Sequence, residues 1–340
     1  MATSYICGPC SVESYEQVMT CAEAISKMGV EVLRAGVWKP RTLPGQFEGK
    51  GEDALQWLNS AKARYGLRIA TEVALPKHVE LCLRYGIDLV WMGARTTASP
   101  FAVDELCTAL SGTGITIYVK NPINPDINLW IGAIQRLQSA NVHVGGAIHR
   151  GFSVSGQTYY RNPPLWQIAN ELRQRMPGIS LIGDPSHMAG KAELVPLIAR
   201  QFINRGYDGL MIECHPSPEK ALTDARQQLT LNETAALLTS LQLVDSTSSS
   251  NELQRLRERI DDIDDRLLTL VAERLSTVER LGAYKQEHRL AFSQPERFRD
   301  MLKERLKWCE THGIRPAFAE HLFELIQQES ILRQKEITGI

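Results

Sequence analysis

The sequence predicts an α/β protein: a closed (β/α)8 barrel of the TIM type, followed by a separate all-helical domain. Eight short apolar runs rich in β-formers recur at intervals of about 30 residues, the length of one βα unit. After residue 250, glycine and proline become rare and charged residues frequent, as in long amphipathic helices. We therefore expect a barrel over 1–243, a Ser-rich linker over 244–252 and a helical domain over 253–340.

Polar residues at the expected strand ends favour a barrel over an open doubly wound sheet, which has the same alternation. The expected strands are 4–7, 31–36, 68–73, 88–93, 116–120, 142–148, 180–184 and 209–214. In a barrel the carboxyl ends of the strands form one ring, where the active site lies. A polar residue stands at or just after each of these ends: Cys10, Arg34, Glu72, Arg95, Lys120, Arg150, His187 and Glu213.

The last ninety residues read as three helices. An apolar seam with alternating spacings of three and four runs through Leu253, Leu256, Ile260, Ile263, Leu267 and Leu270. No glycine or proline interrupts 253–281, a second helix begins at Pro295, and a third is expected over 317–337. The long first helix has no partner of its own length in the chain, so we expect a homodimer through this domain.

Composition excludes several classes of function. The 38 basic and 39 acidic residues leave a net charge of −1, which disfavours nucleic acid and acidic membrane surfaces as partners. No apolar run approaches the ~18 residues of a spanning helix. The N-terminus lacks the pattern of a signal peptide, and seven scattered cysteines suit a reducing compartment. We expect a cytoplasmic protein.

The first chemical motif is CGPC at 7–10. It has the spacing of a dithiol redox motif, but such a motif follows a complete βα unit, and this one follows six residues. Two buried structural thiols are a further alternative. We favour Cys10 as a metal ligand with His187, Glu213 and Asp224, because thiolate, imidazole and carboxylates together suit a divalent ion such as Mn, Fe, Co or Zn.

The second signal is a group of cations at the same rim. Its members are Arg34, Lys39, Arg41, Arg95, Lys120 and Arg150. Unpaired cations would repel one another, so the group indicates anionic ligands, phosphate plus carboxylate, which arginine forks fit. A rim of structural ion pairs is the alternative.

Six ordered strings resemble the type I 3-deoxy-D-arabino-heptulosonate 7-phosphate (DAHP) synthases, in the group closest to the 3-deoxy-octulosonate 8-phosphate synthases. They are CGPCSVES (7–14), LRAGVWKPRT (33–42), GAR (93–95), IYVK (117–120), GDPSH (183–187) and IECHPSPEKALTD (212–224). The resemblance implies a metal-dependent condensation of phosphoenolpyruvate with erythrose 4-phosphate, in aromatic amino-acid biosynthesis through the shikimate pathway.

The same resemblance implies roles for individual residues. The metal ligands would be Cys10, His187, Glu213 and Asp224, with Mn favoured. Phosphoenolpyruvate would contact Arg34, Lys39, Arg95, Lys120 and Arg150, with Lys39 catalytic, and the aldose phosphate would contact Arg41 and Thr42. The strings HRG (149–151) and TLPG (42–45) depart from the usual family pattern.

The tail resembles the all-helical chorismate mutases. The matching strings are LRERI (256–260), AER (272–274), LGAYK (281–285), ERF (296–298) and ESILRQ (329–334). They imply a site built from Arg257, Arg274, Lys285, Arg297, Ser330 and Gln334, with Lys285 and Gln334 catalytic, that converts chorismate to prephenate. Gln294 and Phe298 depart from the family pattern. The alternatives are a tail that only dimerises and senses chorismate or prephenate as a feedback regulator, and a lyase acting on isochorismate.

Overall fold

The structure is a computed structural model and describes residues 4–41, 44–155, 159–245, 251–291 and 294–338. Contacts divide the chain into two compact units, Met1–Arg259 and Ile260–Ile340. Each unit is described by itself. Among the described residues, no helix combines the length and the apolar character that crossing a membrane requires.

The first unit contains the predicted barrel. Its strands are β1 (Ser4–Gly8), β2 (Val32–Arg34), β3 (Arg68–Val73), β4 (Leu89–Met92), β5 (Thr116–Lys120), β6 (Val144–His149), β7 (Leu181–Gly183) and β8 (Gly209–His215). Each pairs in parallel with the next, and β1 pairs with β8, with Ser4 opposite Gly209, so the ring is closed. The eight expected strands are confirmed. A short β9 (Leu229–Thr230), which the sequence did not suggest, adds to β8.

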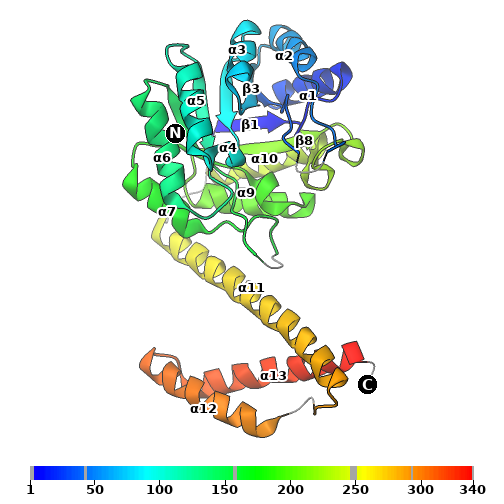
Figure 1. The fold of residues 1–340 in the computed structure, drawn as a ribbon, viewed down its shortest axis with the longest axis vertical. Helices are drawn as coiled ribbons and strands as arrows, with labels where there is room; N and C mark the ends of the chain where they lie inside the picture. Colours follow the sequence, from blue (N-terminus) through cyan, green and yellow to red (C-terminus); the bar gives the residue numbers. More distant parts are fainter. Residues whose placement is uncertain (1–3, 42–43, 156–158, 246–250, 292–293, 339–340) are drawn as a thin grey trace. The chain divides into compact units, whose positions relative to one another are not determined.

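Helices follow the strands and lie around the ring (Figure 1). Their bounds are α1 (Tyr15–Lys27), α2 (Glu52–Tyr65), α3 (Pro76–Arg84), α4 (Ala94–Thr97), α5 (Pro100–Leu110), α6 (Ile127–Ser139), α7 (Trp166–Arg175), α8 (Pro185–Ala189), α9 (Val195–Asn204) and α10 (Leu231–Asp245). Short 3-10 turns are η1 (Ala192–Leu194), η2 (Pro218–Lys220) and η3 (Ala225–Gln227). The helix ends carry familiar capping residues. The Ser14 hydroxyl accepts a hydrogen bond from Gln17 N at the start of α1, and Gly66 ends α2 in a left-handed conformation.

The apolar core has two layers, and the inner one forms the floor of the barrel. The outer layer packs the strands against the helices. The inner layer is a smaller cluster of Ile6, Val32, Ala70, Leu89, Trp91, Ile148, Ile182 and Met211. Two cations lie over the Trp91 ring, Arg34 at 5.0 Å and Lys120 at 5.6 Å from its centroid. The core therefore ends in a charged layer that belongs to the strand ends.

The second unit is helical, as predicted. The long helix α11 (Asn251–Glu287) has no break, and α12 (Pro295–Thr311) and α13 (Pro316–Thr338) pack against each other (Figure 1). The apolar seam of α11 stays open: Leu256, Ile260 and Leu270 are 56%, 57% and 64% exposed. Within the described chain, this seam is therefore not covered by the rest of the helical domain.

Candidate active sites

The polar residues of the strand ends gather at one end of the barrel around a cavity of about 380 Å³, which we call the mouth cavity. Its wall includes Cys10, Lys39, Arg41, Glu72, Arg95, Lys120, Arg150, His187 and Asp224. Two predicted residues do not lie on this wall. Arg34 and Glu213 are 1% and 0% exposed and form an ion pair at 3.1 Å. Donors and cations from distant parts of the sequence therefore converge on one space.

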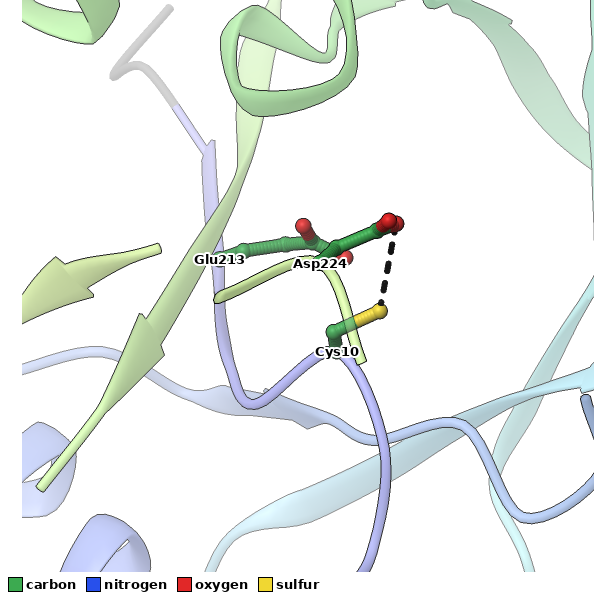
Figure 2. Close-up of side chains that lie close together, drawn as sticks. All are labelled: Cys10, Glu213 and Asp224. Atoms are coloured by element: carbon green, nitrogen blue, oxygen red, sulfur yellow. Dashed lines mark hydrogen bonds between the residues drawn. The ribbon is translucent and has the colours of Figure 1, made fainter. Parts of the chain in front are cut away.

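Three of the four predicted metal ligands form one cluster. The ligand atoms of Cys10, Glu213 and Asp224 lie within 4.8 Å of one another, and the Cys10 thiol donates to Asp224 Oδ2 at 3.6 Å (Figure 2). The fourth, His187, adjoins them: its Nε2 is 3.7 Å from Glu213 Oε1 and 3.8 Å from Asp224 Oδ2. We call these four residues the donor cluster.

The orientation of His187 is set by Asp184, the N-cap of α8. Asp184 Oδ1 accepts from His187 N at 3.2 Å and from His187 Nδ1 at 3.0 Å. Because a carboxylate only accepts, Nδ1 carries the proton of this bond, which fixes the ring with Nε2 toward the two carboxylates. Asp184 also forms a buried ion pair with Lys120 at 2.9 Å. The charges of His187 and Lys120 outweigh burial and hold the pKa of Asp184 well below its usual range.

Glu213 presents an oxygen without a hydrogen-bond donor. Its Oε1 is buried and, among the described residues, accepts no hydrogen bond, although the Arg34 guanidinium lies 3.1 Å away. A buried carboxylate oxygen without a donor is costly. Here it lies 3.7 Å from His187 Nε2 and close to the ligand atoms of Cys10 and Asp224. Potential ligand atoms gathered across so small a space fit a cation between them.

The pKa values of the cluster are set by burial and by neighbouring charges. Burial, with the Glu213 carboxylate adding to it, raises the pKa of the Cys10 thiol to about 12. Burial also acts to raise the pKa of Asp224, but the charges of His187 and Arg161 outweigh it and bring that pKa to about 2. A thiolate among carboxylates needs a metal to exist at neutral pH. The residues present therefore fit a divalent ion of borderline softness.

The cations that line the cavity differ in their burial and in their hydrogen-bond partners. Lys39 Nζ lies 3.1 Å from Cys10 Sγ, at the boundary between the donor cluster and the rest of the cavity. Arg150 donates to Asn162 Oδ1 at 2.8 Å, and burial lowers the pKa of its guanidinium to about 10. Arg95 is exposed on α4. These charges share one cavity without a matching number of carboxylates on its wall, as an anion site requires.

Arg41 belongs to a folded-back loop that begins at Trp38. Trp38 pairs with Gly49, Lys39 N donates to Glu48 O at 2.8 Å, and Arg41 Nε donates to Phe47 O at 2.8 Å. Gly49 has a φ of 101°, and a Cβ there would lie 2.0 Å from Val37 O, so only glycine fits. The loop thus directs Arg41 to the cavity wall. Thr42 lies outside the described residues.

The structure adds three residues that sequence reasoning missed. Asn162 joins Arg150 to the donor cluster, because its Nδ2 also donates to His187 O at 2.7 Å. Arg161 donates to Asp224 Oδ1 at 3.1 Å, and Gln227 donates to Glu213 Oε2 at 2.6 Å. Arg161 and Asn162 lie in a loop, and Gln227 lies in the short 3-10 turn η3. Only the charge of Arg161 could have signalled any of them.

The helical domain brings most of its predicted residues together between α11 and α13. Arg274 Nη1 donates to Ser330 Oγ at 2.5 Å, and Lys285 Nζ donates to Gln334 Oε1 at 3.3 Å. Lys285, Ser330 and Gln334 are 6%, 2% and 3% exposed. Burial lowers the pKa of Lys285, and the charge of Arg297 lowers it further, which places Arg297 within electrostatic range. The side chain of Arg257 lies outside the described residues.

Known proteins resemble both parts of the chain. The family model described as "DAHP synthetase I family" matches residues 2–249, and the model "Chorismate mutase type II" matches 256–335. Phospho-2-dehydro-3-deoxyheptonate aldolase of Thermotoga maritima is 32% identical over 228 residues, covering 66% of this chain and 64% of the relative. The chain thus spans just under two thirds of that relative's length.

Other comparisons agree. A 2-dehydro-3-deoxyphosphooctonate aldolase of Nitratidesulfovibrio vulgaris is 25% identical over 259 residues, covering 69% of this chain and 89% of its own. The crystal structure of the Thermotoga maritima DAHP synthase matches with a TM-score of 0.65 and 29% identity, covering 72% of this chain and 69% of its own. Because the first family model covers well over half of the sequence, the chain belongs to the DAHP synthetase I family, and it carries a chorismate mutase type II domain behind its barrel.

Proposed function

We propose that the barrel condenses phosphoenolpyruvate with erythrose 4-phosphate to DAHP and phosphate, and that the helical domain rearranges chorismate to prephenate. The observation that carries the first activity is the mouth cavity, where the donor cluster and a group of cations meet. Both reactions belong to the shikimate pathway, so one cytoplasmic chain would serve two steps of aromatic amino-acid biosynthesis.

Cys10, His187, Glu213 and Asp224 would hold the divalent ion, for which we favour Mn. When bound, the ion supplies Lewis acidity at the aldehyde oxygen of the sugar phosphate. Asp184, which holds His187 Nδ1, would keep the ring oriented so that Nε2 can serve as the ligand atom. Lys39, next to Cys10 Sγ, lies where it can reach both the ion site and the substrates, which supports its assignment as a catalytic residue.

The remaining cations would hold the two polyanions. Lys39, Arg95, Lys120 and Arg150 line the cavity and would bind phosphoenolpyruvate. Arg34 would support them from below, because it is buried under Cys10 and donates to Cys10 O at 3.2 Å. Arg41, with Thr42, would bind the phosphate of erythrose 4-phosphate. Bringing two anions together in a fixed orientation is a large part of such catalysis.

In the helical domain, the cations would bind a dicarboxylate. Arg274, Arg297 and the partner-derived Arg257 would hold the chorismate carboxylates, with Ser330 orienting Arg274. Lys285 and Gln334 would donate to the ether oxygen, on which negative charge grows in the transition state. No general base is needed, and none of the proposed contacts requires one.

The mutase site would be completed by a homodimer. Arg257 and Lys285 both lie on α11, 28 positions apart, or about 42 Å at ~1.5 Å per residue. One small substrate cannot bridge that distance. The exposed seam of α11 offers an apolar surface for a second copy of the helix running antiparallel, which would bring Arg257 of one chain to Lys285 of the other.

The decisive experiment measures both products. Phosphate release should require phosphoenolpyruvate, erythrose 4-phosphate and a divalent metal, and a chelator should abolish it. Chorismate consumption should persist in the chelated protein and disappear in Lys285→Ala. If the protein binds chorismate without converting it, the tail is a sensor, and the mutase half of the proposal fails.

A further inference from the structure

Gln227 lies in the middle of the donor cluster although its amide is no base at neutral pH and its only possible ligand atom, Oε1, is turned to Arg161. It ends the 3-10 turn η3, directly after Asp224, and is 1% exposed. Its Nε2 donates to Glu213 Oε2 at 2.6 Å and, at a longer 3.4 Å, to Asp224 Oδ2. Its Oε1 accepts from Arg161 Nη1 at 2.6 Å. A single buried amide thus contacts two carboxylates and a guanidinium.

These partners allow one orientation of the amide. A guanidinium only donates and an ionised carboxylate only accepts, so the carbonyl must face Arg161 and the NH2 group must face Glu213. The flipped amide would place its oxygen against Glu213 Oε2 and its NH2 group against the guanidinium. The arrangement is therefore specific to a side chain that donates on one side and accepts on the other.

The consequence is that one oxygen of each carboxylate is held by a short hydrogen bond from outside the donor cluster. Glu213 Oε2 is held by Gln227, while Oε1 accepts no hydrogen bond from the described residues and lies 3.1 Å from Arg34 and 3.7 Å from His187 Nε2. Asp224 Oδ1 is held by Arg161 at 3.1 Å, while Oδ2 has only the longer contacts to Gln227, Cys10 Sγ and His187 Nε2, at 3.4, 3.6 and 3.8 Å. Asp224 also has a left-handed φ of 47°, and Gln227 N donates to its carbonyl at 3.1 Å. Such a backbone persists where its surroundings hold it.

We propose that Gln227 is a positioning residue for the divalent ion, held in its orientation by Arg161. It would hold Glu213 through Oε2 while Arg161 holds Asp224 through Oδ1, so that Glu213 Oε1 and Asp224 Oδ2 would be the oxygens kept in place to bind the ion. The inference rests on the proposed metal-dependent synthase. Partners of this kind typically change metal affinity 10–100-fold when they are removed.

The test measures Mn(II) binding to the full chain by the loss of the free-ion EPR signal. Gln227→Met keeps the volume of the side chain and removes both hydrogen-bonding groups, and we expect the Mn(II) dissociation constant to rise about 10–100-fold. Gln135→Met, at an exposed position of α6, is the matched control and should bind as the unmodified protein does. Excess Mn(II) should restore most synthase turnover in Gln227→Met. Unchanged affinity in a folded Gln227→Met protein would overturn the proposal.

A second variant, Arg161→Met, keeps the proposal testable if Gln227→Met does not fold. The side chain of Arg161 is 47% exposed, so Arg161→Met should fold and should weaken Mn(II) binding less than Gln227→Met does. Where both fold, the double variant should lose less than the sum of the two losses in binding free energy, because Arg161 acts partly through Gln227. Unchanged affinity in Arg161→Met would contradict the role of Arg161. If the unmodified protein binds no Mn(II), the metal-dependent function fails first, and this inference fails with it.

Discussion

The two candidate sites differ in whether a single chain supplies all of their residues. In the barrel, Cys10 and Asp224 are 214 positions apart in the sequence, yet the closed ring brings Cys10 Sγ to 3.6 Å from Asp224 Oδ2. In the helical domain, Arg274, Lys285, Ser330 and Gln334 meet between two helices, but the seam of α11 stays exposed. A closed sheet gathers distant residues by itself. A long helix separates its own residues along its axis, so a site that needs both of its ends needs a second chain.

The largest effect should come from the donor cluster and should stay within the barrel. Cys10→Ser removes the soft ligand, so we expect Mn(II) affinity and synthase turnover to fall by more than about 100-fold, beyond the range typical for a lost outer partner. Chorismate mutase activity should be unchanged. Isothermal titration with Mn(II) and phosphate release measure the first two, and chorismate absorbance measures the third.

Cys7→Ser is the matched control for that experiment. Cys7 is fully buried in the apolar layer between sheet and helices, away from the mouth cavity. A serine there costs stability but leaves the donor cluster in place, so metal affinity and turnover should be retained below the unfolding temperature. Equal losses in both variants would favour a dithiol or structural role for CGPC and would remove Cys10 from the metal site.

The next effect tests whether the helical site is shared between chains. Arg257→Ala and Lys285→Ala should each abolish mutase activity. After unfolding and refolding together in equal amounts, half of the dimers are mixed and each has one intact site, so about a quarter of the original activity should return. Recovery should be absent for two variants on the same side of the proposed site, Arg274→Ala with Lys285→Ala. If mixed dimers form and activity does not return, the site lies within one chain.

A smaller effect separates the two phosphates inside the mouth cavity. Arg41→Ala should raise the KM for erythrose 4-phosphate about tenfold, a loss of ~1.4 kcal/mol, and should change the KM for phosphoenolpyruvate less. Arg150→Ala should do the reverse, because Arg150 is held by Asn162, which itself donates to the His187 carbonyl, and so lies on the side of the cavity next to the donor cluster. Steady-state kinetics with one substrate saturating resolves the two constants. The opposite order would move the aldose phosphate away from Arg41.

The same difference between a closed ring and a long helix decides how much of each site the sequence could predict. In the barrel, residues at strand ends such as Cys10, Lys120 and Glu213 could be placed together because closure of a parallel ring fixes where all strand ends meet. In the tail, the 3.6-residue period placed Arg274 and Lys285 on one helix face, and the unbroken α11 is confirmed. Periodicity alone could not say which residues of α13 they would meet.

Loops and fully buried strands set the limits. Gln227, in a short 3-10 turn, and Asn162, in a loop, are uncharged amides, and nothing in their residue type or spacing distinguishes them from polar residues that face solvent. The sequence could assign Arg34 to the rim. It could not predict that Arg34 lies beneath the cavity wall, because β2 is buried along its whole length. His149 shows the same limit: in a strand buried on both faces, alternation does not reveal which side chains point inward.

The smallest expected effect is on the pH dependence of stability, and it should come from His149 of the barrel and not from the helical domain. His149 points into the layer between sheet and helices, fully buried, where Nε2 donates to Pro164 O at 2.6 Å and Nδ1 accepts from Tyr207 Oη at 2.8 Å. Burial lowers its pKa to about 3, and the charges of Arg150 and Arg205 act in the same direction, while Asp184 opposes them. His288, His312 and His321 of the helical domain are, by contrast, exposed.

Because the folded pKa of His149 lies below the unfolded value of about 6.5, only the unfolded chain takes up this proton as the pH falls below 6.5. The contribution to stability is therefore complete above about pH 6.5 and is lost progressively toward pH 3, by about 2 kcal/mol between pH 7 and pH 5. His149→Gln can keep both hydrogen bonds and cannot titrate, so its urea-unfolding free energy should fall less over this range than that of the unmodified protein. The mutase-deficient Lys285→Ala chain should keep the full pH dependence. Equal slopes in the unmodified protein and His149→Gln would show that His149 is already protonated in the fold, and that the barrel does not bury it as a neutral group.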